Sequence, residues 1–137
     1  MVALLIETDM LLSALNTSDS FNKVARKVIE LDGLLLSPFS LLELNLLARA
    51  EKLKISDYAV FAKDLDSLLQ ARAIEVLSDR PQYHAEARRF ESDFKLTFFD
   101  SLHGAVSKIQ REIIVSFDRA YDRLGDEGVE RLDPEDI

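Results

Sequence analysis

LLIETD, residues 4–9, is the stretch of sequence that decides the fold. The run 2–6 is apolar without the polar gaps of an amphipathic helix, which is typical of a strand buried on both faces. It ends at Glu7, Thr8 and Asp9. In open α/β sheets, sites form beyond the carboxyl ends of the strands. The stretch therefore predicts a buried strand that delivers carboxylates to one edge of a sheet.

The rest of the chain alternates short apolar runs with segments of helical spacing. Strands are expected at 2–6, 34–37, 73–77, 113–117 and 129–132, and helices at 10–15, 18–31, 38–48, 58–70, 82–94, from Asp100 onward and at 118–124. This alternation predicts an α/β fold, a three-layer α/β/α sandwich with a mainly parallel central sheet covered on both faces. At 137 residues and 47% hydrophobic content, a single domain over residues 1–137 is expected.

Charge and composition narrow the function. The formal net charge of -8 argues against a surface built to wrap nucleic acid, although a local basic rim around an acidic pocket remains compatible with it. The chain has no cysteine, so disulfides, thiolate nucleophiles and cysteine-based zinc sites are excluded and any metal must be held by oxygen or histidine. No signal peptide or membrane-spanning run is recognisable, so a cytoplasmic protein is expected.

Acidic residues stand beside four of the apolar segments. They are Glu7 with Asp9, then Glu43, Asp100 and Asp118. Asp9, Asp100 and Asp118 have an alternative interpretation as ordinary helix N-caps. Glu43 does not, because it projects from a largely apolar helix face, where an unpaired carboxylate is costly unless a metal or a basic partner compensates.

A carboxylate cluster favours Mg²⁺ or Mn²⁺, which prefer oxygen ligands. A metal held in this way lowers the pKa of a bound water and stabilises charge on a phosphodiester under attack. The acidic set therefore indicates phosphodiester hydrolysis.

Four segments together resemble the PIN domain, the ribonuclease fold of the VapC toxins and related nucleases. They are LLIETDMLLSAL, SPFSLLELNLLA, FFDSLHGAV and IIVSFDRAYD, and the resemblance runs along essentially the whole chain. It implies an endoribonuclease that depends on Mg²⁺ or Mn²⁺ and acts on RNA. It also implies a homodimer and an antitoxin protein, encoded by a neighbouring gene, as inhibitor.

The resemblance assigns roles to particular residues. Glu43 matches the family's helix glutamate, Asp100 its third acid and Asp118 its fourth, while Ser116 matches the Ser or Thr that orients the site. The first acid is a departure from the family pattern. The family's opening strand usually ends in Asp-Thr-Asn or Asp-Thr-Asp, and here Glu7 stands at the first of these three positions and Asp9 at the third. Three outcomes remain open: metal binding through the longer Glu7 side chain, substitution by Asp9, or a weakened site.

Three further residues are candidates for supporting roles. Asp122, one turn after Asp118, is either an acid that supports the site or a solvated surface charge. His103, one turn after Asp100, is either a general base or a packed or surface histidine. Arg119 is a candidate RNA contact.

Two other functions compete with the nuclease. One is a catalytically weakened PIN-fold module that binds RNA or protein, which the Glu7 departure and the acidic net charge favour. The other is a phosphoryl-transfer enzyme of another doubly wound fold, which is disfavoured because no glycine-rich loop follows the first strand.

Overall fold

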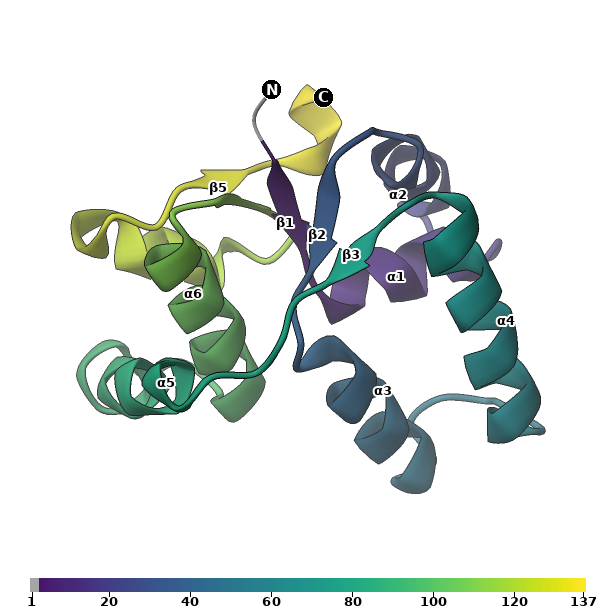
Figure 1. Ribbon diagram of the computed structural model, residues 1–137, viewed down its shortest axis with the longest axis horizontal. Helices are drawn as coiled ribbons and strands as arrows, with labels where there is room; N and C mark the ends of the chain where they lie inside the picture. Colours follow the sequence, from purple (N-terminus) through teal and green to yellow (C-terminus); the bar gives the residue numbers. More distant parts are fainter. Residues whose placement is uncertain (1–2) are drawn as a thin grey trace.

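A five-stranded parallel sheet forms the centre of the molecule (Figure 1). The computed structural model describes residues 3–137. The strands are β1 (Leu4–Ile6), β2 (Leu34–Leu36), β3 (Glu75–Val76), β4 (Ile113–Val115) and β5 (Arg131–Leu132), in the spatial order β3-β2-β1-β4-β5. Residues 1 and 2 lie outside the described residues, so only the first residue of the predicted strand 2–6 falls outside them.

The register places the first apolar run in the middle of the sheet. Leu4 pairs with Leu34 on one side and with Ile113 on the other. Because neighbouring strands are parallel, their carboxyl ends meet at the same edge. The predicted α/β fold with a mainly parallel sheet is confirmed.

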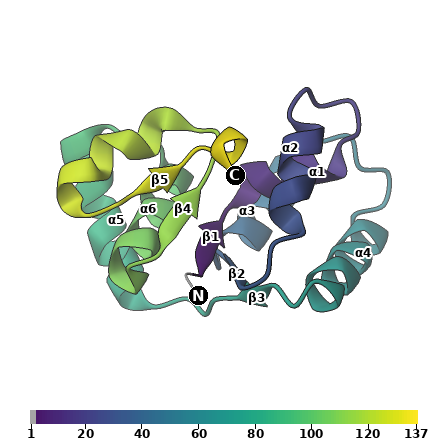
Figure 2. The same ribbon diagram turned by 90° about the horizontal axis from the view of Figure 1, so that it is seen from above.

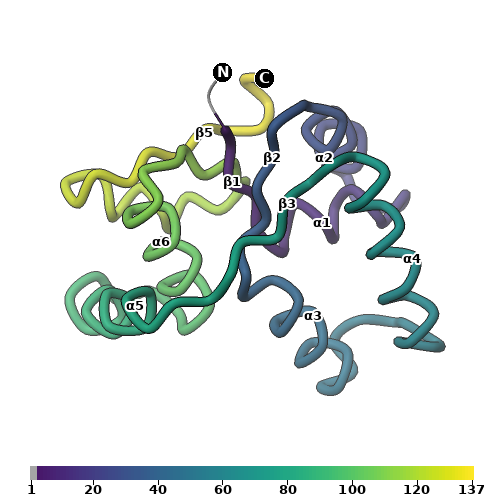
Figure 3. Tube along the Cα trace, in the orientation of Figure 1, coloured from purple at the N-terminus to yellow at the C-terminus, as the bar shows by residue number. Residues whose placement is uncertain are grey.

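Helices cover both faces of the sheet. They are α1 (Thr8–Leu15), α2 (Asn22–Ile29), α3 (Ser40–Arg49), α4 (Tyr58–Ala71), α5 (Pro81–Phe94) and α6 (Phe98–Gln110), with the 3₁₀ helices η1 (Arg119–Glu127) and η2 (Pro134–Asp136). Figure 2 shows α5 and α6 on one side of the strands and α1, α2 and α4 on the other. The trace in Figure 3 follows the chain from β2 out through α3 and α4 and back to β3. Within residues 3–137, no helix is long and apolar enough to cross a membrane.

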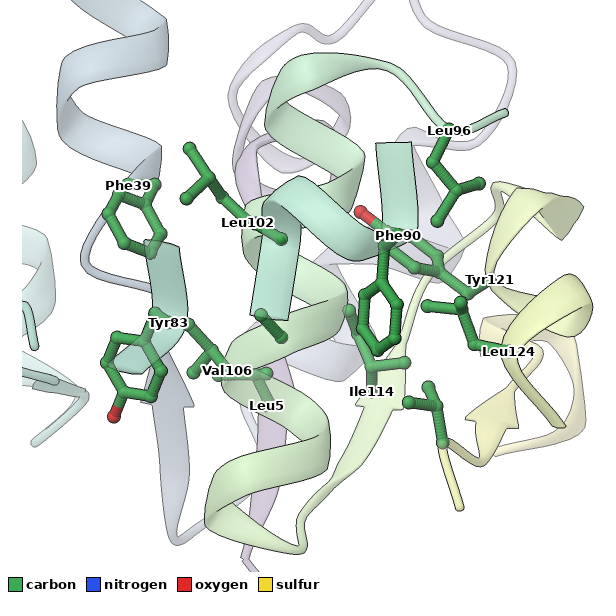
Figure 4. Close-up of a cluster of buried hydrophobic side chains, with 13 residues drawn as sticks. Leu5, Phe39, Tyr83, Phe90, Leu96, Leu102, Val106, Ile114, Tyr121 and Leu124 are labelled. Carbon is green, nitrogen blue, oxygen red and sulfur yellow. The ribbon is translucent and has the colours of Figure 1, made fainter. Parts of the chain in front are cut away.

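Each face of the sheet has its own hydrophobic core. On one side, Leu5 and Ile114 pack with buried residues of α5, α6 and η1, including Phe90 and Tyr121 (Figure 4). On the other side, Ile6, Leu36 and Val115 pack with Met10, Val28 and Leu69 from the helices. Successive strand residues therefore serve opposite cores, which explains why the strand sequences are apolar without alternation.

The helix caps differ from two of the sequence predictions. Asp9 does not cap α1; Glu7 does, and its carboxylate accepts a hydrogen bond from the Asp9 backbone N–H at 3.2 Å. Asp100 does not open α6, because Thr97 is the N-cap and accepts from the Asp100 N–H at 3.3 Å. Asp118 is a true N-cap, of η1. The predictions erred because both helices begin earlier than their hydrophobic spacing indicates.

Candidate active site

The acidic residues gather at the carboxyl edge of the sheet. Glu7 directly follows β1, and Asp118 follows β4. Asp100 lies in the first turn of α6, and Glu43 in the first turn of α3. The charges of Asp9, Glu43 and Asp100 each raise the pKa of Glu7, which shows that the acids lie within electrostatic range of one another.

Glu7 is the most enclosed member of the cluster. It is 2% exposed, and both of its carboxylate oxygens have protein partners. Oε1 accepts from the Asp9 N–H at 3.2 Å and lies 3.5 Å from the Ser116 hydroxyl, and Oε2 accepts from the Tyr121 hydroxyl at 3.3 Å. Burial, and then the charges of Asp9, Glu43 and Asp100, raise the pKa of Glu7 well above its usual value.

Tyr121 connects two of the acids. Its hydroxyl lies 3.3 Å from Oε2 of Glu7 and 3.3 Å from Oδ1 of Asp100, and a hydroxyl with one proton donates to only one of them at a time. Burial, followed by the neighbouring charge of Asp118, raises the pKa of Asp100 to about 6. Burial, and then Glu7 and Asp100, raise the pKa of Tyr121 well above its usual value, so this hydroxyl keeps its proton.

Ser116 and Asp118 belong to one turn at the end of β4. The buried Ser116 hydroxyl accepts from the Asp118 N–H at 3.0 Å, and the Asp118 carboxylate accepts from the Ala120 N–H at 2.9 Å. This turn holds Asp118 next to Asp100. The Ser116 hydroxyl thus lies within 3.5 Å of Glu7 Oε1 and binds the Asp118 backbone.

Asp9 lies at the rim of the cluster. Its side chain reaches solvent, while partial burial, and then the charges of Glu43 and Asp118, raise the pKa of its carboxyl. Glu7 and Asp9 therefore occupy different positions, one inside the cluster and one at its mouth.

Glu43 has a histidine partner. Its Oε1 accepts from the Thr8 hydroxyl and from Nε2 of His103 at 2.9 Å, and its side chain is 19% exposed. His103 is completely buried, with Nδ1 2.6 Å from the Ser37 hydroxyl. The basic partner that the apolar surroundings of Glu43 required is thus His103.

Sequence reasoning missed Thr8, Ser37 and Tyr121 and gave His103 too little weight. Three of these residues had a detectable signal: Thr8 follows the first acid, Ser37 ends the second strand, and Tyr121 comes one turn after Asp118. Each lies near a strand end or a first helical turn at the same edge.

The two remaining candidates lie outside the cluster. Asp122 points outward and pairs with Arg131, Oδ1 to Nε, at 2.9 Å. Arg131 in turn donates to the Ser116 backbone carbonyl at 2.9 Å, so Asp122 reaches the site only through this arginine. Arg119 is exposed and follows Asp118 directly.

The donor set fits a hard divalent cation in its chemistry. Every acid in the cluster offers carboxylate oxygens, and a cation would relieve the mutual repulsion that raises the pKa values of Glu7 and Asp100. Within residues 3–137, no three acidic or histidine side chains form a ready-made cage. Mg²⁺ does not require one, because it is commonly bound through one or two carboxylates and keeps several waters.

The fold and the site together are those of an α/β domain with acidic side chains gathered at the carboxyl edge of a parallel sheet. The PIN domain family model matches residues 4–127. The chain therefore belongs to the PIN domain family, whose members are generally nucleases. Among curated proteins, no significant sequence match is found.

Solved structures share the fold along almost the entire chain. FitAcB from Neisseria gonorrhoeae has a TM-score of 0.70 at 18% identity, covering 98% of this chain and 99% of that one. VapBC-1 from nontypeable Haemophilus influenzae has a TM-score of 0.66 at 14% identity, covering 98% and 99%. A toxin-antitoxin complex from Klebsiella pneumoniae has a TM-score of 0.65 at 14% identity, covering 96% and 97%. At these identities the likeness establishes the fold.

Proposed function

We propose that this chain is a Mg²⁺- or Mn²⁺-dependent endoribonuclease that hydrolyses phosphodiester bonds in RNA. The observation that carries the proposal is the set of carboxylates brought to one edge of the sheet, with the pKa values of Glu7, Asp9 and Asp100 raised by burial and by neighbouring acids. Keeping several carboxylates close together lowers the stability of the folded protein, and such perturbed groups cluster at functional sites.

Each acid has a distinct task in this proposal. Glu7, Glu43, Asp100 and Asp118 hold the cation, and Asp9 stands at the mouth of the site. The bound cation would activate a water and stabilise negative charge on the phosphodiester. Ser116 and the Asp118 backbone fix the fourth acid through their 3.0 Å hydrogen bond.

The RNA contact is confined to the rim of the site. With a net charge of -8, the protein offers little for unspecific phosphate binding. The bound metal ion and nearby basic side chains such as Arg119 therefore attract the RNA phosphates. A short contact of this kind favours a few nucleotides around the scissile bond over a long stretch of duplex.

RNA cleavage tests the proposal directly. Purified protein is expected to cut labelled single-stranded or structured RNA when Mn²⁺ is present and to lose this activity in EDTA. Glu43→Gln should abolish cleavage, because it removes a cation ligand but preserves the shape of the side chain. Glu75→Gln, an exposed residue on the edge strand β3, is the matched control and should cleave normally. Equal cleavage in EDTA would rule out the mechanism.

A homodimer and an antitoxin partner belong to the same proposal. Leu41, Leu42 and Leu46 are exposed on α3, and such apolar surface favours association. A structural relative is a toxin-antitoxin complex, which supports a partner protein as inhibitor. Light scattering should give about twice the 15.5 kDa chain mass, and the adjacent gene's product should inhibit cleavage. A monomeric mass would contradict the dimer.

A non-catalytic RNA- or protein-binding module is the alternative function. It is favoured by one observation, that both oxygens of Glu7 already have hydrogen-bond partners within the protein. Calorimetric titration with Mn²⁺ separates the two functions. A nuclease site requires carboxylate-dependent Mn²⁺ binding, whereas the module requires none.

A further inference from the structure

The two oxygens of Glu43 are in unequal surroundings. Oε1 accepts hydrogen bonds from the Thr8 hydroxyl and from His103 Nε2. Among residues 3–137, no hydrogen bond reaches Oε2. One oxygen is thus anchored to the protein, and the other is available to a ligand on the partly exposed side of the residue.

A carboxylate can only accept a hydrogen bond, so the 2.9 Å contact with Glu43 requires a proton on Nε2 of His103. The Phe39 N–H points at the Ser37 hydroxyl oxygen at 3.4 Å, so this oxygen accepts, and its own proton needs an acceptor. The nearest candidate is Nδ1 of His103, at 2.6 Å. With Nδ1 accepting, Nε2 carries the ring proton and donates it to Glu43.

We infer that His103 is a positioning residue: its Nε2–H, directed by Ser37 on Nδ1, anchors Oε1 of Glu43 and leaves Oε2 for a ligand. This inference rests on the proposed function in one respect only, namely that Oε2 of Glu43 binds the cation. The ring itself is 0% exposed, which fits the packed histidine that the sequence allowed beside a general base.

The anchor matters because glutamate on a helix is flexible. Glu43 has several rotatable bonds, and holding its carboxylate in one orientation before a cation arrives removes an entropic cost from binding. Residues that orient a metal ligand through a hydrogen bond have a large influence on affinity, although they do not touch the metal. Thr8 lies in α1, His103 in α6 and Ser37 directly after β2, so the fold itself sets the position of Glu43.

Two substitutions separate the two ring nitrogens. The glutamine amide in His103→Gln can replace the donor at Nε2, whereas the asparagine amide in His103→Asn reaches only the position of Nδ1. Calorimetric Mn²⁺ titration should therefore show nearly normal affinity for His103→Gln and a loss of about 10- to 100-fold for His103→Asn. His84→Asn is the control, because His84 is exposed and pairs with Asp79 at 2.9 Å. Melting curves verify that each variant is folded.

Nitrogen NMR of the wild-type imidazoles tests the contact without any metal. The chain contains two histidines, so assignment is simple. Long-range ¹H–¹⁵N spectra should show His103 with its proton on Nε2, and Glu43→Gln and Ser37→Ala should each shift its signals while leaving those of His84 unchanged.

The outcomes are distinguishable. A proton on Nδ1, or equal Mn²⁺ affinity in His103→Asn and wild type, would overturn the inference. A wild-type protein that shows the Nε2 proton and yet binds no Mn²⁺ would contradict the proposed function while leaving the Glu43 anchor established. Low affinity in both His103 variants with unchanged melting would also overturn the inference, because the donor at Nε2 would not be the decisive feature.

Discussion

Glu7 is integrated into the site by contacts that a shorter acid would not make in the same way. Its carboxylate caps α1, meets the Ser116 hydroxyl and receives the Tyr121 hydroxyl, all within 3.5 Å. It is also fully enclosed, whereas Asp9 reaches solvent. In the proposed function, Glu7 is therefore the acid at the end of β1 that binds the cation together with Asp100, and Asp9 faces the incoming substrate.

Paired amide substitutions decide between these two acids. Glu7→Gln keeps the shape of the side chain but removes a buried charge from a repulsive cluster, so the melting temperature should rise near neutral pH. The same change should weaken Mn²⁺ binding by at least about tenfold, on the scale of lost metal-site contacts. Asp9→Asn should produce smaller effects of both kinds. Calorimetry and thermal unfolding measure them, and a larger loss of affinity for Asp9→Asn would transfer the ligand role to Asp9.

Elements were easier to predict than contacts. The apolar runs at 2–6, 34–37 and 113–117 identified the central strands, which are observed at 4–6, 34–36 and 113–115, because a strand buried on both faces needs apolar residues throughout. The sequence also indicated which acids share an edge, since parallel strands end on the same side. Helix starts were harder to predict, because Asp9 is a preferred N-cap residue, whereas the observed N-cap of α1 is Glu7, a residue type that seldom caps helices.

Side-chain pairs across elements were beyond the sequence. Ser37 and His103 are 66 positions apart, and Thr8 and Glu43 are 35 apart, so no local pattern connects them. His103 looked like an ordinary packed histidine, which in terms of burial it is. Only the three-dimensional structure reveals that the ring nitrogens of His103 contact Ser37 and Glu43.

The packing of α6 against η1 depends on one glycine. A Cβ at Gly104 would lie 2.6 Å from the Leu124 Cδ1 atom and within 3.8 Å of the Phe90 ring. Since α6 carries Asp100 and His103 while η1 is capped by Asp118, this close approach sets the distance between halves of the site. The absence of a side chain at position 104 therefore leaves the space that the Leu124 side chain fills between α6 and η1.

Gly104→Val should force α6 and η1 apart. Overpacking a tight core contact typically costs about 1–3 kcal/mol of stability, and Leu124 is fully buried with little room to move. Denaturant unfolding should show this loss, and Mn²⁺ affinity should fall with it. Gly125→Val is the matched control, because nothing lies within 4 Å of a Cβ at Gly125. Equal stability of Gly104→Val and wild type would show that η1 adapts to the added side chain.

For the whole molecule, the acidic cluster makes the free energy of unfolding depend on pH. The pKa of Asp100 is raised from 3.8 to about 6, and that of Glu7 is raised well above its usual value, so the folded protein binds protons more tightly than the unfolded chain. The stabilising contribution of these protons is fully present below the unfolded pKa values. It is lost as the pH rises through the folded ones.

Unfolding experiments across this pH range should reveal the cluster, and a cation should reverse its effect. Without divalent metal, the contribution of Asp100 to the free energy of unfolding should decline between about pH 4 and pH 6, the interval between its two pKa values. Asp100→Asn should flatten this part of the profile relative to wild type.

Mn²⁺ at neutral pH should raise the wild-type melting temperature, because a ligand that binds only the folded state stabilises it. The same Mn²⁺ should raise that of Asp100→Asn much less. A wild-type profile with the same slope as Asp100→Asn, or an equal Mn²⁺ shift in both proteins, would mean that the edge of the sheet carries neither the proton-binding acids nor the cation site assigned to it.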